Sequence, residues 1–550
     1  MKKKVLLPVL LAALAFPLAL SHNSSALSAE FIGEFGSRGS QDRADYIAHA
    51  SKVNAQLADE GFVLLKNDGF LPVDTSDEDN PPKVTLVGKA STNLIKGGEG
   101  SGAGSTSSGV TDYNLKKSFQ EAGFEINPTT DAFYSSSSKS GSGRTQSNPN
   151  AWDGNSQHTV GETDIEKVKA EPGLLDSFLE YNDFAVLVVS RSGSEGCDVK
   201  TCNTHDSIKT NNSSEAVSHK HALELSDNEQ AIFDLLHEYF DHIIFVINSS
   251  NIFECDVFEN DPKVSGILWI GNPGDVGPGA VGRILSGEVN PSGRTVDTWT
   301  RDFTQDPTFQ NFSDNAQTNL VEYNGKEYYV PRDTMLNADG TPTRSYGTLK
   351  SYTSTSSIPW DTARSAGDVA KTIKGGISGV KPSAYVSYEE DIYLDYRYYE
   401  TRYADMAKTD KAAADEWYNG VEGVVYPFGF GCSYTTFDQK IVRVSPAKNS
   451  ALTKDSDVIN VSVKVTNTGE VAGKDAVQLY WKAPYKEGEI EKADHVLCAF
   501  DKTDLIEPGE SQVMQLTFHL QDVANYDAFD KNNNDFKGYE LDGGEYELML

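Results

Sequence analysis

FAVLVVSRSGSEGCD, residues 184–198, joins a run of apolar residues to a loop of small residues that contains a glutamate. The run FAVLVV (184–189) has no polar member, so it predicts a strand that is buried on both faces. Such strands occur mainly in parallel sheets that helices cover on both sides. Ligand sites in these sheets lie beyond the carboxyl ends of the strands, and Glu195 stands at such a position in the sequence.

The rest of the first half of the chain alternates between apolar runs and amphipathic stretches. The further strands that we expect are FVLL (62–65), KVTLVG (83–88), HIIFVIN (242–248) and VSGILWIG (264–271). The helices that we expect are Gln41–Asp59, with a stripe of Ile47, Ala48, Val53 and Leu57; 115–123, ended by Gly123; and 225–240, begun by the capping-box pair Ser226 and Glu229. This alternation predicts an α/β domain with a largely parallel sheet.

Two polar segments, 135–160 and 303–375, interrupt this pattern, and we expect them to be loop-rich insertions. From about residue 437 the apolar residues alternate with a period of two. The strands that this period predicts lie in VINVSVKVTNTG (458–469), KDAVQLYWKAP (474–484), QVMQLTFHL (512–520) and GEYELML (544–550). Short alternating strands separated by turn residues predict a β-sandwich over about the last 110 residues.

Composition limits the classes of function. A chain of 550 residues is too long for one ordinary domain, and 38% hydrophobic residues are enough to fill real cores. The formal net charge of −33 argues against binding to nucleic acid, since two polyanions repel each other. An acidic surface is compatible with a neutral substrate without identifying one.

The first 29 residues predict a signal for export. Three lysines precede the apolar run VLLPVLLAALAFPLAL, and small residues at Ser24–Ala26 offer a cleavage position. The run is shorter than the roughly 20 residues that a membrane-spanning helix needs, and Pro8 and Pro17 interrupt it. Cleaved export is the preferred interpretation, and an uncleaved membrane anchor is the alternative.

Cysteine is sparse, with five residues and no CxxC pair, so no zinc site is expected. Cys197 and Cys202 share one loop, and spacing alone does not decide whether they pair. DKNNND (530–535) resembles the start of a calcium loop, but Asp535 stands where glycine is expected and Leu541 where glutamate is expected. A polar hairpin turn is the better interpretation, and we expect no metal and no cofactor.

Several segments together resemble the carboxy-terminal half of glycoside hydrolase family 3, the β-glucosidase and β-xylosidase type. They are EGFVLLKNDGFLPV (60–73), SRSGSEGCD (190–198), LSDNEQAIF (225–233), GEVNPSGRT (287–295), YEEDIYLDYRYYET (388–401) and YPFGFGCSYTTF (426–437). NTGEVAGKDAVQLYWKAP (467–484) resembles the fibronectin type III-like module of that family. The resemblance implies a layered α/β sandwich over residues 30–436, followed by a fibronectin type III-like β-sandwich over 437–550.

By this resemblance, Glu195 occupies the position of the general acid/base of a retaining glycosidase. Glycoside hydrolysis commonly uses two carboxylates, one of which protonates the leaving oxygen while the other attacks the sugar carbon. Gly193 and Gly196 let the backbone bend beside Glu195 and approach a ligand closely. Without the resemblance, a solvated loop glutamate with no specific role would be the default interpretation.

The family's nucleophile is an aspartate on a (β/α)8 barrel, and no segment here matches it, so no residue of this chain is given that role. The resemblance is to a domain-permuted subgroup, and we expect a barrel as a partner domain, either in cis beyond residue 550 or in trans. The glycine-rich KGGEGSGAGSTSSG (96–109) matches a loop near the substrate cleft, which makes Gly98, Glu99 and Gly100 candidates for lining it. The expected activity is that of a β-glucosidase on β-linked oligosaccharides or aryl glycosides. The alternative is a non-catalytic module that binds carbohydrate or protein.

Overall fold

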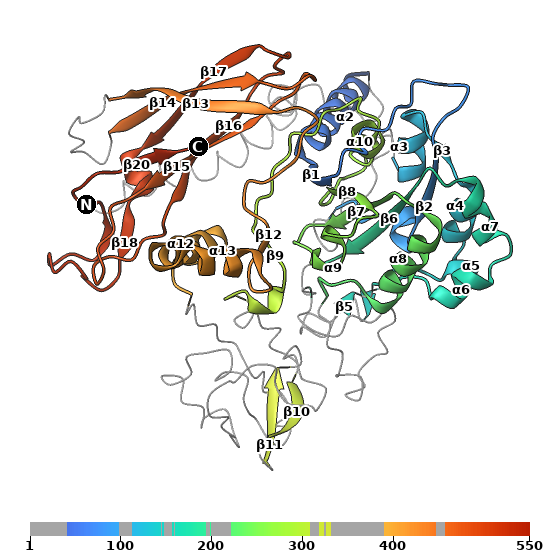
Figure 1. The fold of residues 1–550 in the computed structure, drawn as a ribbon, viewed down its shortest axis with the longest axis horizontal. Helices are drawn as coiled ribbons and strands as arrows, with labels where there is room; N and C mark the ends of the chain where they lie inside the picture. Colours follow the sequence, from blue (N-terminus) through green and yellow to red (C-terminus); the bar gives the residue numbers. More distant parts are fainter. Residues whose placement is uncertain are drawn as a thin grey trace, which may run out of the picture.

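A computed structural model shows the chain as an α/β domain and a β-sandwich that lie side by side (Figure 1). The structure describes residues 41–97, 113–144, 146–147, 157–158, 160–193, 199, 222–308, 318–323, 326–331, 390–446 and 457–550. The predicted leader therefore lies outside the described residues. Within the described residues, no helix is both long and apolar enough to cross a membrane.

The α/β domain is built on a six-stranded sheet with the order β1-β8-β7-β6-β2-β3. Its strands are β1 (Val63–Asn67), β2 (Lys83–Val87), β3 (Glu125–Ile126), β6 (Phe184–Arg191), β7 (Ile243–Ser249) and β8 (Val264–Trp269). The pairs β3–β2, β2–β6, β6–β7 and β7–β8 are parallel, and only β1 pairs antiparallel, at the edge beside β8. The predicted, largely parallel sheet is confirmed.

Helices cover both faces of this sheet, which explains why its strands are apolar throughout. Ala185, Leu187 and Val189 of β6 face one core, whereas Val186 and Val188 face the other. The first core is closed by α4 (Pro128–Ser135), α6 (Ile165–Ala170), α7 (Leu174–Glu180) and α8 (Asp227–Tyr239). The second is closed by α3 (Leu115–Glu121), α10 (Gly279–Leu285) and the end of α2 (Gln41–Gly61). Short elements complete the domain: η1 (Lys89–Thr92), α5 (Ser137–Ser140), α9 (Asp256–Glu259) and the paired β4 (Gln146–Ser147) and β5 (Gln157–His158).

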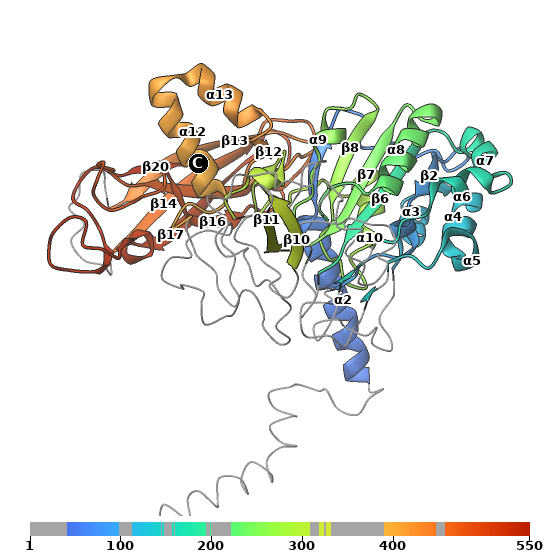
Figure 2. The same cartoon turned by 90° about the horizontal axis from the view of Figure 1, so that it is seen from below.

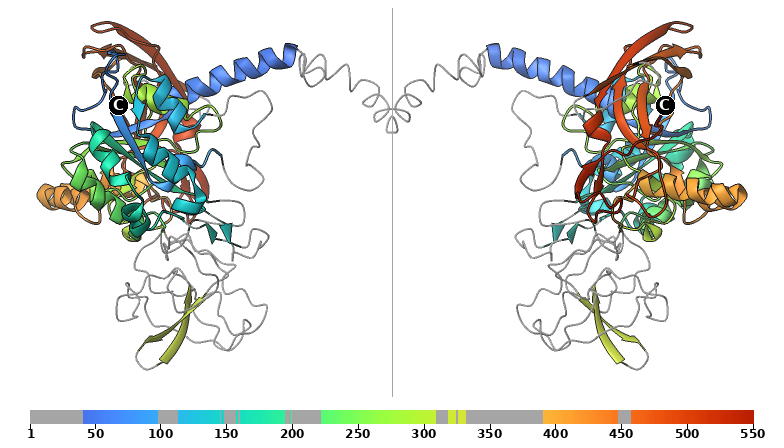
Figure 3. Two further views of the ribbon diagram at one scale, coloured as in Figure 1. Left: turned by 90° about the vertical axis from the view of Figure 1, so that its right-hand side faces the viewer. Right: turned by 90° about the vertical axis from the view of Figure 1, so that its left-hand side faces the viewer.

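Helix α2 departs from its predicted packing. The sequence predicts a stripe of apolar side chains that faces a core, yet the side chain of Leu57 is 65% exposed and that of Val53 is 41% exposed. Ala48 is exposed as well, and it is Ala58, near the end of the helix, that is buried. The reason is visible in Figure 3, where α2 projects away from the body of the molecule and only its last turns meet the domain.

The second domain has two three-stranded antiparallel sheets. One has the order β13 (Phe437–Ser445), β14 (Val458–Asn467), β17 (Ser511–His519), and the other has the order β16 (Val496–Lys502), β15 (Ala476–Lys482), β20 (Glu547–Met549). A separate hairpin pairs β18 (Asn525–Asp527) with β19 (Gly538–Glu540), after η5 (Leu520–Val523). The predicted β-sandwich is confirmed, with a core between the sheets that includes Val463, Leu479 and Phe518.

The segment between the two domains contains elements that the sequence analysis did not predict. Helices α12 (Tyr396–Thr409) and α13 (Lys411–Asn419) pack together around Tyr399 and Trp417. Short strands β9 (Trp299–Thr300) and β12 (Val424–Tyr426) pair, and η3 (Phe303–Gln305) follows β9. The segment 303–375, predicted to be loop-rich, contains an antiparallel hairpin of β10 (Thr318–Tyr323) and β11 (Lys326–Pro331).

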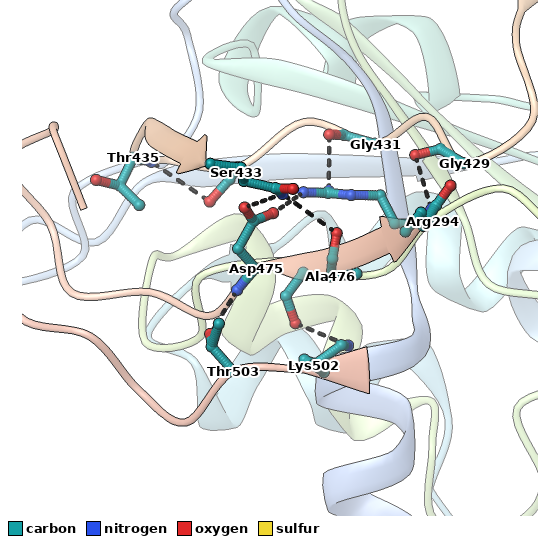
Figure 4. Close-up of polar contacts among 12 residues, drawn as sticks. Arg294, Gly429, Gly431, Ser433, Thr435, Asp475, Ala476, Lys502 and Thr503 are labelled. Atoms are coloured by element: carbon teal, nitrogen blue, oxygen red, sulfur yellow. Dashed lines mark hydrogen bonds and ion pairs between the residues drawn. The ribbon is translucent and has the colours of Figure 1, made fainter. Parts of the chain in front are cut away.

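The two domains are joined by a polar network at Arg294 (Figure 4). Arg294 Nη2 donates to Asp475 Oδ1 at 2.7 Å, and its Nη1 donates to the carbonyl of Gly431 at 2.8 Å. The other carboxylate oxygen of Asp475 accepts from Gln439, and its backbone is held by Thr503. Lys474 adds a 2.7 Å ion pair with Glu60 at the end of α2. The ion pairs thus tie the start of β15 to the α/β domain.

We expect the substitution Asp475→Asn to destabilise the protein by about 2–3 kcal/mol. It leaves the guanidinium of Arg294 without its counter-charge at a site where the two side chains are 17% and 5% exposed, and breaking a fully buried pair costs about 3–5 kcal/mol. Calorimetry measures the shift in the unfolding transition. Asp405→Asn is the matched control, since its pair with Lys408 is exposed, and it should leave the transition unchanged. Equal midpoints for both variants would contradict the assignment.

Candidate functional site

The candidate site lies at the edge of the sheet where the parallel strands β2, β6, β7 and β8 end. Figure 2 shows these strands side by side in the α/β domain, with α2 extending away from them. The segments that follow these four ends carry the glycine-rich loop, the Glu195 segment and the residues that hold both of them. Glu195, Gly98, Glu99 and Gly100 themselves lie outside the described residues, as do Cys197 and Cys202.

The segment that carries Glu195 is anchored by one arginine at the end of β6. Arg191 makes a bidentate pair with Glu229, with Nη1 to Oε1 at 2.8 Å and Nη2 to Oε2 at 2.6 Å. Its Nη2 also donates to the carbonyl of Glu224 at 2.5 Å, and its Nε donates to the carbonyl of Ala222. The chain therefore leaves the sheet at Arg191. Residues 222–229, which follow the Glu195 segment in the sequence, contact the side chain of Arg191.

The charges of this anchor are buried, with 3% exposure for Arg191 and 1% for Glu229. Glu229 also accepts from the backbone nitrogen of Ser226 at 2.8 Å, while Ser226 Oγ accepts from Glu229 N at 3.2 Å, so the predicted capping box of α8 is confirmed. The ring of Phe253 lies 4.8 Å from the guanidinium carbon and covers it. Burying two charges is unfavourable, and the hydrogen bonds of Arg191 together with the ring of Phe253 offset that free energy.

Both ends of the glycine-rich loop are held by the segment that follows β8. Gly274 N donates to the carbonyl of Lys96, the first residue of the loop, at 2.5 Å, and Tyr113 N, four residues after the loop, donates to the carbonyl of Asp275 at 2.8 Å. The described residues that flank the glycine-rich loop thus lie at the same edge of the sheet as Arg191.

Asn248, the penultimate residue of β7, connects the segments that follow β2 and β8. Its Oδ1 accepts from Ile95 N at 2.6 Å, and its Nδ2 donates to the carbonyls of Ile95, at 2.9 Å, and Gly271, at 2.7 Å. The sequence analysis did not identify this residue. A signal was present, because an asparagine near the end of an otherwise apolar run needs hydrogen-bond partners when it is buried.

A second buried basic side chain, that of Lys89, lies near the end of β2. Lys89, directly after β2, donates from Nζ to the carbonyl of Tyr134 at 2.6 Å and to Ser140 Oγ at 2.9 Å. Burial lowers the pKa of Lys89, and the nearby carboxylate of Glu162 opposes that shift. Gly88 precedes it with φ 92°, and a Cβ there would lie 2.7 Å from the carbonyl oxygen of Val188. The end of β2 therefore packs against β6 only because residue 88 has no side chain.

An open groove of about 450 Å³ adjoins this edge. One wall is the second half of α2 with the residues after it, including Leu57 and Phe62, and the other wall is the segment 269–276 after β8. The second wall contains Gly274 and Asp275, which hold the ends of the glycine-rich loop. The groove is thus continuous with the loops of the site and is bordered by the exposed apolar side of α2.

The described residues offer no arrangement for a metal ion, because no three His, Cys, Asp or Glu side chains converge in them. In the hairpin turn DKNNND, Asp530 uses its carboxylate to accept from the backbone nitrogens of Asn534, at 2.8 Å, and Asp535, at 3.2 Å. Cys255, Cys432 and Cys498 are free thiols.

Comparison with known proteins gives the family. The chain matches the glycosyl hydrolase family 3 C-terminal domain over residues 62–434 and the fibronectin type III-like domain over residues 475–550. The chain belongs to glycosyl hydrolase family 3. The resemblance predicted from the sequence motifs is confirmed, and so is the fold class that it implied, because the structure has the α/β sandwich and the β-sandwich in that order.

The curated relatives of this family 3 chain are longer than the chain itself. It is 27% identical over 517 residues to "Beta-glucosidase A" of Butyrivibrio fibrisolvens, which covers 91% of the chain and 49% of the relative. It is 25% identical over 510 residues to "Beta-glucosidase" of Ruminococcus albus, covering 92% of the chain and 39% of the relative. The chain thus spans half or less of each of these enzymes.

Solved structures of the family share the fold. A β-glucosidase from Paenibacillus barengoltzii is similar with a TM-score of 0.59 and 22% identity, over 91% of this chain and 41% of that one. β-glucosidase 3B from Thermotoga neapolitana, solved with α-D-glucose, is similar with a TM-score of 0.56 and 23% identity, over 87% of this chain and 50% of that one. At this identity the similarity establishes the arrangement of the domains' elements, not the activity.

We expect Glu229→Gln to free the anchored segment before it unfolds the domain. The change leaves the guanidinium of Arg191 buried without a counter-charge, and losing one partner of such a pair costs about 3–5 kcal/mol. Limited proteolysis should then cut within residues 194–221 at a protease concentration that leaves the wild type intact. Glu238→Gln, an exposed carboxylate on the same helix, is the control. If both variants resist the protease equally, Arg191 does not hold this segment.

Proposed function

We propose that this chain is the acid/base-bearing part of a family 3 β-glucosidase and that Glu195 is its proton donor. The observation that carries the proposal is the anchoring of the Glu195 segment by Arg191 at the carboxyl edge of a parallel sheet. The ends of the glycine-rich loop are fixed at the same edge. The curated relatives cited above are named β-glucosidases, which supports a β-linked glucoside as the substrate.

In the proposed reaction, Glu195 acts twice. As a carboxylic acid it protonates the glycosidic oxygen while a second carboxylate bonds to the sugar carbon and the leaving group departs. As a carboxylate it then removes a proton from the water that breaks the glycosyl–enzyme bond, which restores the acid and retains the configuration. The second carboxylate stands about 5 Å away in retaining enzymes, and we propose that a (β/α)8 barrel domain supplies it.

We propose that the barrel contacts the groove beside α2. The groove adjoins the segment after β8, which holds the ends of the glycine-rich loop, so a domain seated there lies at the same edge of the sheet as the end of β6. Its wall includes Leu57, which is 65% exposed and which a docked domain would remove from water. The part of the relatives that the chain does not span is large enough for such a domain.

The decisive test is how strongly Glu195→Gln slows the hydrolysis of substrates with different leaving groups. We expect full activity on an aryl β-glucoside only when the chain is fused to the part of the Butyrivibrio β-glucosidase A that it does not match. In that fusion, Glu195→Gln should slow cellobiose hydrolysis by about 10²- to 10⁴-fold, the contribution of a general acid. The same substitution should slow the glycosylation step of a dinitrophenyl glucoside much less, because that leaving group departs without protonation.

Glu238→Gln is the control, since Glu238 is an exposed glutamate on α8 to which we assign no proton transfer. Activity of the unfused chain at the level of the fusion would show that a nucleophile lies within residues 1–550. A folded fusion that binds cellobiose but hydrolyses neither substrate would favour the non-catalytic module instead. Loss of the alkaline limb of the kcat/KM profile in Glu195→Gln would support its role as the acid.

We also propose that the leader directs export, with the mature chain starting near residue 29. Lys2–Lys4 and the apolar run after them support this, as described above. Expression of the full chain should yield an extracytoplasmic product whose first residues, read by N-terminal sequencing, follow Ser24–Ala26. A variant lacking residues 1–29 should stay inside the cell. A full-length chain in the membrane fraction would instead favour the anchor.

A further inference from the structure

The hairpin of β18 and β19 exposes an unusual set of aromatic side chains. Tyr526 is 55% exposed, Phe529 72%, Phe536 51% and Tyr539 72%. These four residues, called here the aromatic hairpin, are the only exposed large apolar side chains between Val523 and Leu541, and none of them is aliphatic. Val523 and Leu541, at the two ends, pack in the core of the β-sandwich instead. The two large aliphatic residues at the ends therefore contact the core, whereas the four aromatic residues between them are exposed.

The turn that carries these rings is fixed by carboxylates. Asp527, which is buried, accepts from the backbone nitrogens of Phe529 at 2.9 Å and Lys531 at 2.6 Å. Asp530 accepts in the same way from two backbone nitrogens further along the turn. These bonds hold three non-glycine residues at positive φ, namely Asp530, Asn533 and Asp535. Because the turn is preorganised, its exposed rings lose less conformational freedom when they bind.

The rings are also held in defined orientations. Tyr526 and Tyr539 stand opposite each other in the register of the hairpin, on its outer face, with ring centroids 5.0 Å apart at an interplanar angle of 68°. Phe536 packs over Gly538, where a Cβ would lie 2.7 Å from its Cε1 atom. One side of the Phe536 ring thus rests on backbone while half of the side chain stays exposed. Exposed rings that are fixed by their own fold suit a ligand that stacks on them.

We propose that the aromatic hairpin binds a neutral polysaccharide chain, a β-glucan in the first instance. The less polar face of a pyranose ring presents C–H groups, which interact favourably with the negative face of an aromatic ring. The sugar's hydroxyl groups require polar partners at the rim, and Asp535 and Asn534 are exposed beside the rings. The choice of a β-glucan rests on the proposed β-glucosidase function, whereas the aromatic surface itself does not.

The charge of the hairpin favours a neutral polysaccharide over an anionic polymer or a second copy of the chain. The turn carries Asp527, Asp530, Asp535 and Glu540 against Lys531 and Lys537, and the whole chain has a net charge of −33. This charge disfavours an anionic polymer and opposes the close approach of a second copy of the chain. The hairpin lies on the side of the β-sandwich away from the six-stranded sheet, so it is separate from the proposed active site (Figure 1). A neutral polymer bound there is held close to the enzyme without occupying that site.

The test is affinity electrophoresis of the whole chain in native gels that contain soluble mixed-linkage β-glucan, xylan, dextran or alginate. We expect retardation in β-glucan and none in alginate. The double variant Tyr526→Ala/Tyr539→Ala should weaken the β-glucan dissociation constant about tenfold or more, corresponding to ~1.4 kcal/mol per factor of ten. Tyr539→Phe should bind like the wild type, because stacking needs the ring rather than the hydroxyl.

Phe500→Ala is the matched control, since Phe500 is a 73% exposed aromatic residue on β16, outside the hairpin. Its retardation should equal that of the wild type, and unfolding curves should show that all variants fold. The proposal is overturned if the double variant is retarded as strongly as the wild type, or if no neutral polysaccharide retards the wild type. It is also overturned if the wild type self-associates in sedimentation and the double variant does not, because the hairpin is then a contact between copies. Binding is measured without hydrolysis, so a failure here is distinct from a failure of the proposed catalysis.

Discussion

A parallel sheet that is covered on both faces accepts a polar side chain only where that side chain finds hydrogen-bond partners, and this constraint organises the α/β domain. Every side chain of β6 up to Val189 lies in one of the two cores, so its arginine appears at the last position, Arg191. A guanidinium at such a position loses most of its hydration, and its full set of partners compensates for that loss. Those partners come from residues 222–229, the described residues that follow the Glu195 segment in the sequence.

The same constraint explains why the neighbouring loops are tied to one another rather than to solvent. Asn248 is buried, so its amide must find donors and acceptors within the protein, and it finds them in the segments after β2 and β8. The backbone of the segment after β8 then holds both ends of the glycine-rich loop. Such contacts hold the described bases of these loops to one another.

The sequence predicted those features that depend on local pattern. The buried strands, the capping box of α8 and the period of two in the β-sandwich each follow from side chains close together in the chain, and the structure confirms them. It did not predict Arg191 as the anchor, because the partner Glu229 is 38 residues away and only folding brings the two together. The prediction that the apolar stripe of α2 faces a core was wrong for a related reason. Periodicity shows that a helix is amphipathic, but it does not show which surface covers the apolar face. The position of Glu195 stays a prediction from the family resemblance.

Splitting a catalytic pair between two domains has a physical consequence for the proposed acid. A carboxyl group keeps its proton near neutral pH only where its charged form is disfavoured, and desolvation by a neighbouring surface provides this. Under the proposed function, the barrel both supplies the nucleophile and completes an environment that disfavours the charged form of the acid. Keeping a carboxyl group protonated one pH unit above its ordinary range costs ~1.4 kcal/mol of docking free energy. Burial of Leu57 and of the groove beside α2 under the barrel would offset this cost, because removing apolar surface from water is favourable.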